Sequence, residues 1–254
     1  MCGVFGLSFS SDSVIDHKKL TTDIASFVAL SSERGRGSVG LAVQQEGHVQ
    51  IHKRFLSPKE FLRSKSYAKF LGALAKELSY EKSFSLIGQC RLSTSGSLAQ
   101  YQNNQPIAFD DIVGVHNGII TRIGDQSVSF PEGVLTKNEK ESASDSHHFF
   151  QAIQSLVQGG KDPFEAVQNI FSKLRGAANI GLLVPGSEEI ILATNSGSIY
   201  YSDLEDQGTF LFASEKKILD TFIRESGRQS ESSVRQLMPG EALSFDPFSQ
   251  NIQK

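Results

Sequence analysis

The sequence predicts an α+β fold in which layers of strands and helices pack on one another. Short β-type runs dominate, and many are apolar at successive positions, as in strands that are covered on both faces. Helices separate clusters of strands instead of alternating with single strands, which favours a layered α+β domain over a doubly wound α/β fold. The expected strands are Cys2–Phe9, Ser38–Gln44, Val49–Arg54, Ser83–Cys90, Ile112–His116, Ala178–Val184, Glu189–Thr194, Ser198–Tyr201, Thr209–Ala213 and Ala242–Phe245.

Helix start signals or apolar stripes mark four further segments. Ser57 stands at an N-cap position, with Pro58 in the first turn and Glu60 placed to close a capping box. The same pattern begins at Asp162, and Gly176 is a natural stop for that helix. A third segment has an apolar stripe at helical spacing, and the fourth is shorter. The expected helices span residues 57–79, 144–158, 162–176 and 214–226.

Composition excludes several classes of protein. The 254 residues are 39% hydrophobic and 21% charged, which is ordinary for a globular protein. A net charge of -3 argues against nucleic acid or an anionic membrane as the main partner. No run approaches the roughly 20 apolar residues of a membrane-spanning helix, and the N-terminus lacks the basic region of a signal peptide. Two cysteines are too few for a disulfide scaffold or a cysteine-rich zinc site, so a reducing cytoplasm is the simplest location.

One of the two cysteines directly follows the initiator methionine in "MCGVFG". The small residue permits removal of Met1, which would leave Cys2 with both a thiol and a free α-amino group. A thiol with a pKa near ~8.5 is only slightly ionised at neutral pH and needs a base. The α-amino group, with a pKa of about 8, can serve its own residue as that base. Chance placement is the alternative interpretation.

Three other stretches offer groups for substrate binding and catalysis. Arg91 ends the strand-like part of "GQCRLSTSG", where it could grip a carboxylate through two parallel hydrogen bonds or simply lie on the surface. Asn117-Gly118 could form a type I′ turn or supply an amide and a backbone N–H to an oxyanion. Asp145 in "SASDSHHFF" could cap a helix or bind an ammonium group.

Taken in order, these motifs resemble the class II glutamine amidotransferases, the glutaminase domains of the N-terminal nucleophile hydrolases. The resemblance covers most of the chain, and its strength lies in the order of individually weak motifs. They are "CGVFG" after Met1, "RGRGSVG", "GQCRLSTSG", "NNQPI", "VHNGII" and "SDSHHF", followed by "ATNSGSIYY", "FASEKKIL" and "LMPGEALSFD".

The resemblance implies a four-layer αββα sandwich of two mainly antiparallel sheets flanked by helices, with residues 1–254 forming a single domain. It implies a glutaminase, and the chain shows no metal, flavin or nucleotide signature, so no metal and no cofactor are expected. Cys2 would attack the carboxamide of L-glutamine, release ammonia and leave a thioester for hydrolysis to glutamate. The other roles that it implies are oxyanion stabilisation by Asn117 and Gly118, carboxylate binding by Arg91, ammonium binding by Asp145, a pocket lined by Thr94 and Ser95, and a loop shaped by Arg34.

Two departures from the family pattern leave the ammonia acceptor undetermined. Gln89 stands where members commonly have a histidine, and Leu92 where they often have a large aromatic residue. "NNQPI" is similar to the phosphoribosylpyrophosphate amidotransferase branch, whereas "VHNGII" is similar to the glucosamine-6-phosphate synthase branch.

The sequence favours a free-standing glutaminase that supplies ammonia to a separate synthetase or transferase, because no second domain follows the glutaminase motifs. Hydrolysis of other γ-glutamyl amides and a catalytically inactive regulatory subunit are the alternatives. The polar segments Ser95–Gln102 and Gly124–Ser142 are expected to be loops that close over glutamine or contact the partner. We expect Cys90 to be a core residue, and adjacent His147 and His148 to be unsuited to sharing a metal.

Overall fold

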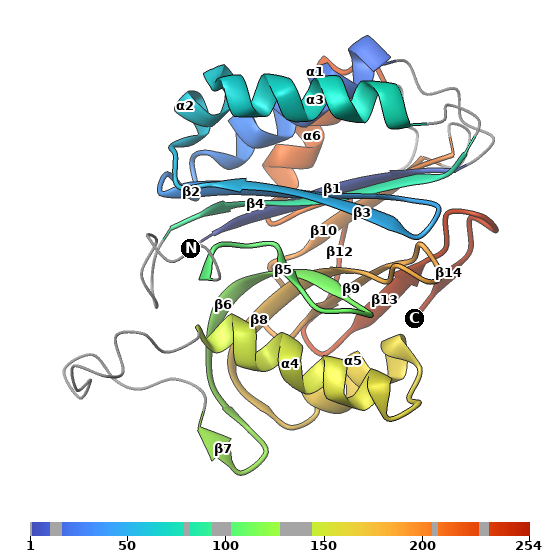
Figure 1. Ribbon diagram of the computed structural model, residues 1–254. Coiled ribbons are helices and arrows are strands. Elements are labelled where there is room, and N and C mark those ends of the chain that lie inside the picture. Colours follow the sequence, from blue (N-terminus) through green and yellow to red (C-terminus); the bar gives the residue numbers. More distant parts are fainter. Residues whose placement is uncertain are drawn as a thin grey trace.

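Two antiparallel sheets lie face to face at the centre of the structure, and helices cover the outer face of each (Figure 1). The structure is a computed structural model that describes residues 2–10, 17–78, 82–92, 103–127, 144–204, 208–228 and 234–254. The layers confirm the expected four-layer αββα sandwich. In the described residues, no helix is long and apolar enough to cross a membrane.

The first sheet has β1 near its centre, between β11 and β4. Every residue of β1 is buried, as its nearly continuous apolar sequence predicts for a strand covered on both faces. The order β12-β10-β11-β1-β4-β2-β3 comprises Arg235–Gln236, Tyr200–Leu204, Thr209–Ala213, Gly3–Phe9, Phe84–Arg91, Ser38–Gln45 and His48–Arg54.

The second sheet is built around the long antiparallel pair of β6 and β8, with a bulge between Ile120 and Arg122. Its order is β14-β13-β9-β8-β6-β5, and β7 pairs with the far end of β6. These strands are Ile252–Gln253, Ala242–Phe245, Ile190–Thr194, Leu174–Leu183, Val113–Ile123, Ile107–Ala108 and, for β7, Gln126–Ser127.

Three apolar cores hold the four layers together. One lies between the first sheet and α1, α2, α3 and α6, a second between the second sheet and α4 and α5, and a third between the two sheets. Burial of these faces is the main stabilising contribution to the sandwich. The helices are His17–Ser31 (α1), Pro58–Arg63 (α2), Lys65–Glu77 (α3), Asp145–Gln158 (α4), Pro163–Phe171 (α5) and Lys216–Glu225 (α6).

Two helix predictions were wrong in extent. The capping box of Ser57 and Glu60 is present, but the helix ends after six residues because Ser64 adopts an extended conformation. The Ser64 hydroxyl then accepts a hydrogen bond from Tyr67 N and caps α3, so the expected single helix is two. Similarly, α5 ends at Phe171, and Gly176 lies within β8 instead of stopping a helix.

Two further features differ from the sequence prediction. Helix α1 was not expected, although its residues Leu20, Ile24, Phe27 and Val28 are buried against the first sheet. The expected strand ending at His116 continues to Ile123, so the Asn-Gly pair lies inside β6 and makes no hairpin turn.

Candidate active site

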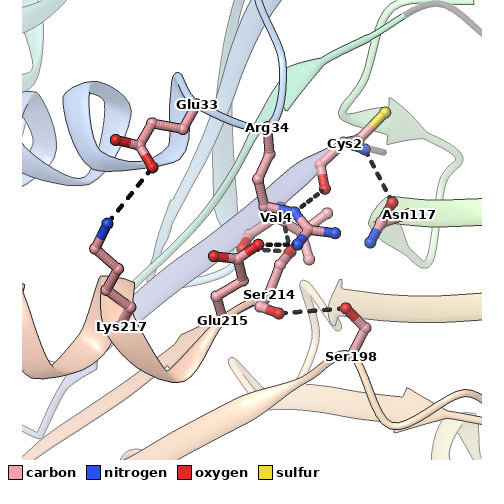
Figure 2. Close-up of polar contacts among 9 residues, drawn as sticks. All are labelled: Cys2, Val4, Glu33, Arg34, Asn117, Ser198, Ser214, Glu215 and Lys217. Atoms are coloured by element: carbon pink, nitrogen blue, oxygen red, sulfur yellow. Dashed lines mark hydrogen bonds and ion pairs between the residues drawn. The ribbon is translucent and has the colours of Figure 1, made fainter.

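Cys2 lies just before β1 and is held by side chains on two sides (Figure 2). Its backbone nitrogen donates to Asn117 Oδ1 at 3.0 Å, and its carbonyl accepts from Arg34 Nε at 3.0 Å. The thiol points away from both residues in Figure 2 and donates to the carbonyl of Leu92 at 3.4 Å. Only 8% of Cys2 is exposed, so the N-terminal end of the described chain is a fixed part of the fold.

Asn117 and Gly118 lie in the middle of β6, opposite Asn179 and Ala178 of β8. The Asn117 side chain is buried, and its Nδ2 has no hydrogen-bond partner among the described residues. Asn179 Nδ2 donates to the Asn117 carbonyl at 2.9 Å and fixes the backbone from β8. Gly118 has φ of 154°, and a Cβ there would lie 1.9 Å from the Ala177 carbonyl oxygen, so this position requires glycine.

Arg91 ends β4, which pairs with β1 so that Cys90 is opposite Gly3. The guanidinium is buried and donates through Nη1 to Asn104 Oδ1 at 3.1 Å. Burial lowers the pKa of Arg91, while the nearby Cys2 thiolate and Asp145 carboxylate act in the opposite direction. Arg91 is therefore buried and not the surface side chain of the alternative interpretation.

Asp145 opens α4, but the capping residue is Ser144, whose hydroxyl accepts from His147 N. The Asp145 carboxylate instead accepts from Ile120 N and Ser146 N, each at 2.9 Å. One of these donors follows Gly118 by two residues in β6, so Asp145 is tied to the same strand as Asn117. The structure thus brings four residues together from two strands, a helix and the position just before β1: Arg91, Asn117, Asp145 and Cys2.

The chain is similar to known proteins in sequence and in fold. No protein-family model matches the chain. The chain is 24% identical over 200 residues to glutamine–fructose-6-phosphate aminotransferase [isomerizing] of Brucella abortus, which covers 78% of this chain and 29% of that protein. A protein of the same name from Bradyrhizobium diazoefficiens is 28% identical over 200 residues, which are 78% of this chain and 29% of that protein. Another, from Bartonella quintana, is 24% identical over 230 residues, which are 88% of this chain and 33% of that protein.

Two solved structures share the fold. Glutamine phosphoribosylpyrophosphate amidotransferase from B. subtilis, complexed with ADP and GMP, superposes with a TM-score of 0.64 at 18% identity, covering 99% of this chain and 48% of that one. A structure described as the allosteric regulatory enzyme of purine biosynthesis superposes with a TM-score of 0.65 at 19% sequence identity, also covering 99% of this chain and 48% of that one. The chain is similar in sequence and in fold to class II glutamine amidotransferases, the family that its motifs resemble. It spans about a third of the length of the curated relatives that it matches.

Burial raises the pKa of the Cys2 thiol, because the thiolate loses hydration. The positive charges of Arg91 and Arg34 act against this effect without reversing it. The thiol is therefore predominantly protonated at neutral pH, and a nucleophilic reaction at this position needs a base.

A buried polar network that the motifs alone did not reveal connects β4, β6 and α4. Gln89, in the place of the family's common histidine, donates to Gln105 Oε1 at 2.9 Å and to the His116 carbonyl. Gln105 Nε2 donates to Ser146 Oγ at 3.1 Å, and His116 Nδ1 lies 2.8 Å from the same oxygen. All four residues lie in motifs quoted from the sequence, but no motif indicated that they contact one another. They are Gln89 in "GQCRLSTSG", Gln105 in "NNQPI", His116 in "VHNGII" and Ser146 in "SDSHHF". The network connects the strand carrying Asn117 to the helix that begins at Asp145.

The structure describes Cys90 but not the expected loops or the two pocket residues next to Arg91. Cys90 is fully buried, burial raises its thiol pKa, and it belongs to the first apolar core as expected. Thr94 and Ser95 lie outside the described residues, as do all of Ser95–Gln102 and residues 128–142 of the second expected loop. Within the described residues, no three His, Cys, Asp or Glu side chains form a group that could hold a metal ion.

Proposed function

We propose that this chain hydrolyses L-glutamine to glutamate and ammonia through a thioester on Cys2. The observation that carries the proposal is that only one of the two polar atoms of the Asn117 side-chain amide has a hydrogen-bond partner. Its Oδ1 accepts from the Cys2 nitrogen at 3.0 Å, while its buried Nδ2 has no partner among the described residues. A buried donor without a partner is destabilising, and an oxyanion formed next to Cys2 would satisfy it.

The proposed reaction has two displacement steps. The Cys2 thiolate attacks the carboxamide carbon, and the resulting oxyanion accepts hydrogen bonds from Asn117 Nδ2 and the Gly118 backbone N–H. The C–N bond then breaks, and the leaving nitrogen takes a proton and departs as ammonia. Water attacks the thioester, the C–S bond breaks, and glutamate leaves with the Cys2 thiol restored.

The proposed base is the α-amino group of Cys2 after removal of Met1. Its pKa of about 8 suits proton transfer near neutral pH, which the raised thiol pKa makes necessary. The hydrogen bond from the Cys2 nitrogen to Asn117 Oδ1 supports this role, because it fixes the orientation of the nitrogen relative to the thiol.

We assign glutamine recognition to two charged groups. Arg91 binds the α-carboxylate through its guanidinium, and Asp145 binds the α-ammonium. Thr94 and Ser95 line the same pocket, and Arg34 shapes the segment next to Cys2. Other γ-glutamyl amides share this head group, so they are the alternative substrates.

The ammonia acceptor is proposed to bind to a separate synthetase or transferase partner. The curated relatives are aminotransferases by name, and the matched region is only 29% to 33% of their length. We propose that residues 1–254 form one glutaminase domain that supplies the nitrogen, while the partner binds the acceptor. A reducing cytoplasm would keep the Cys2 thiol in the reactive state.

Glutamate release from glutamine by the purified chain tests the activity. The processed protein is compared with Cys2→Ala and with a form that carries an N-terminal peptide extension. We expect loss of activity in Cys2→Ala, and a fall of about 10²–10⁴-fold in the extended form, in which the base has become an amide. A γ-glutamyl anilide assayed in parallel tests the alternative substrate class.

Labelling of Cys2 by an electrophilic glutamine analogue, followed by mass spectrometry, separates slow turnover from an inactive site. An unlabelled Cys2 together with no glutamate release contradicts the proposed function. Full activity of the N-terminally extended form contradicts the role of the α-amino group.

A further inference from the structure

Cys2 precedes β1, so the regular strand pairing does not fix it. The described pairing of β1 with β11 begins at Phe5 and Ala213, and the pairing with β4 begins at Gly3. The ends of chains fray unless they are held. The Cys2 nitrogen and carbonyl instead bond to the side chains of Asn117 and Arg34.

Residues at the junction between β11 and α6 also hold the segment that contains Cys2. Ser214 N donates to the Val4 carbonyl at 2.9 Å, and Val4 N donates to Ser214 Oγ at 2.8 Å. The next residue, Glu215, forms an ion pair with Arg34 Nη1. The same two-residue junction therefore holds Val4 directly and Cys2 through Arg34, as Figure 2 shows.

Glu215 is a poor choice for its local position. It is the N-cap of α6, where Ser, Thr, Asp or Asn are preferred, and its side chain makes no capping hydrogen bond. It turns instead to Arg34, whose side chain is only 9% exposed. A local preference that is broken without local compensation points to a role elsewhere in the fold.

Arg34 depends on this carboxylate for its position. Among the described residues, Glu215 is its only ion-pair partner, and Arg34 Nη2 is buried without a hydrogen-bond partner. A buried guanidinium that loses its carboxylate keeps a large desolvation cost, which favours rotation of the side chain toward solvent. Such a rotation would remove the donor from the Cys2 carbonyl.

We propose that Glu215 is a positioning residue for the nucleophile, which it holds in place through Arg34. The proposal rests on the proposed glutaminase function for its effect on turnover, but not for its effect on the thiol itself. A second ion pair between the same two segments offers a matched control. Glu33 and Lys217 lie 3.8 Å apart with side chains 74% and 77% exposed, so water screens that pair.

Three variants test the proposal. Glu215→Gln removes the charge with little change in shape, Glu215→Ser removes it while supplying a preferred N-cap residue, and Glu33→Gln breaks the exposed pair. The first readout is the rate at which iodoacetamide alkylates Cys2, followed by mass spectrometry, with the fully buried Cys90 as the internal unreactive thiol. The second is kcat and KM for glutamine, and the third is the thermal midpoint.

We expect both Glu215 variants to alkylate about threefold faster or more, because a released Cys2 is better hydrated and more accessible. Their kcat should fall by about 10- to 100-fold with little change in KM, since the nucleophile is displaced while the groups proposed to bind glutamine remain. Glu215→Ser should have a higher thermal midpoint than Glu215→Gln, because the serine hydroxyl can cap α6. Glu33→Gln should match the wild type in all three readouts.

Wild-type alkylation rates in Glu215→Gln and Glu215→Ser would overturn the proposal, whatever the kinetics show. Equal changes in Glu33→Gln would also overturn it, because they would reflect general loosening of the α1–α6 contact. A wild-type protein that releases no glutamate would contradict the proposed function, and the alkylation rates would still decide the positioning role.

Discussion

Replacement of Asn117 by aspartate tests the proposed oxyanion site at a single atom. The substitution keeps Oδ1, which accepts from the Cys2 nitrogen at 3.0 Å, and exchanges the unpartnered Nδ2 donor for an oxygen. The contact that orients Cys2 is therefore retained while the proposed donor to the oxyanion is lost. Because the side chain is only 1% exposed and the two residues have nearly the same shape, the packing around β6 should change little.

The expected loss follows from what one oxyanion donor contributes. Removing such a donor lowers kcat by about 10²–10³-fold, or about 2.7–4 kcal/mol in the activation free energy. An ionised aspartate adds repulsion against the developing oxyanion, so kcat at neutral pH should fall by at least this amount. The assay is glutamate release at saturating glutamine, with circular dichroism to verify the fold.

The pH dependence gives a second measurement on the same variant. A protonated aspartate can donate a hydrogen bond, whereas the ionised form cannot. The ratio of variant to wild-type kcat should therefore rise as the pH falls through the pKa of the introduced carboxyl. A folded Asn117→Asp protein that keeps more than about a third of wild-type kcat at neutral pH would refute the assignment, since one lost donor should cost far more.

Two other residues give independent tests. Arg91→Lys keeps the charge but loses the planar fork, so kcat/KM for glutamine should fall about 10- to 100-fold, the equivalent of about 1.5–3 kcal/mol for a charge-assisted hydrogen bond. Initial rates below KM measure this, and an unchanged kcat/KM would remove Arg91 from the site. His52 stacks on Phe70, and burial, with a smaller effect of Arg54, lowers its pKa to about 4. Between pH 6.5 and 4 the unfolded chain binds more protons at this residue than the folded one, so stability should fall as the pH falls. The urea midpoint of His52→Phe should fall less between pH 7 and pH 4.5 than the urea midpoint of the wild type. An equal fall in both proteins would contradict the lowered pKa of His52.

Local chemistry determined much of the fold from the sequence alone. The capping box at Ser57 depends on residues three positions apart, and the burial of β1 follows from its apolar run. Both signals are complete within one segment, so no knowledge of distant contacts is needed. The order of the motifs likewise indicated the family and pointed to Cys2, Arg91 and Asp145 before any of them was placed in space.

Local signals failed where a distant partner was decisive. Asn117-Gly118 has the composition of a tight turn, but pairing with β8 over the whole length of β6 keeps it extended. Gly176 has the composition of a helix stop, but the same strand pair includes it. In both places the hydrogen bonds of a long antiparallel pair outweigh the local preference for a turn or a helix end.

The sequence by itself pointed to the candidate chemical groups, whereas only the tertiary structure decided how they are held. Cys2 stood out by its position behind Met1, but its hydrogen bond to Asn117 spans 115 positions of the sequence. The ion pair of Arg34 with Glu215, which supports Cys2 from the other side, spans 181 positions. Such contacts carry no local signature, because side chains meet only after the sheets have packed. Glu215 in particular is a poor N-cap when its sequence neighbours alone are considered, and the fold explains its presence by the buried guanidinium that it pairs with.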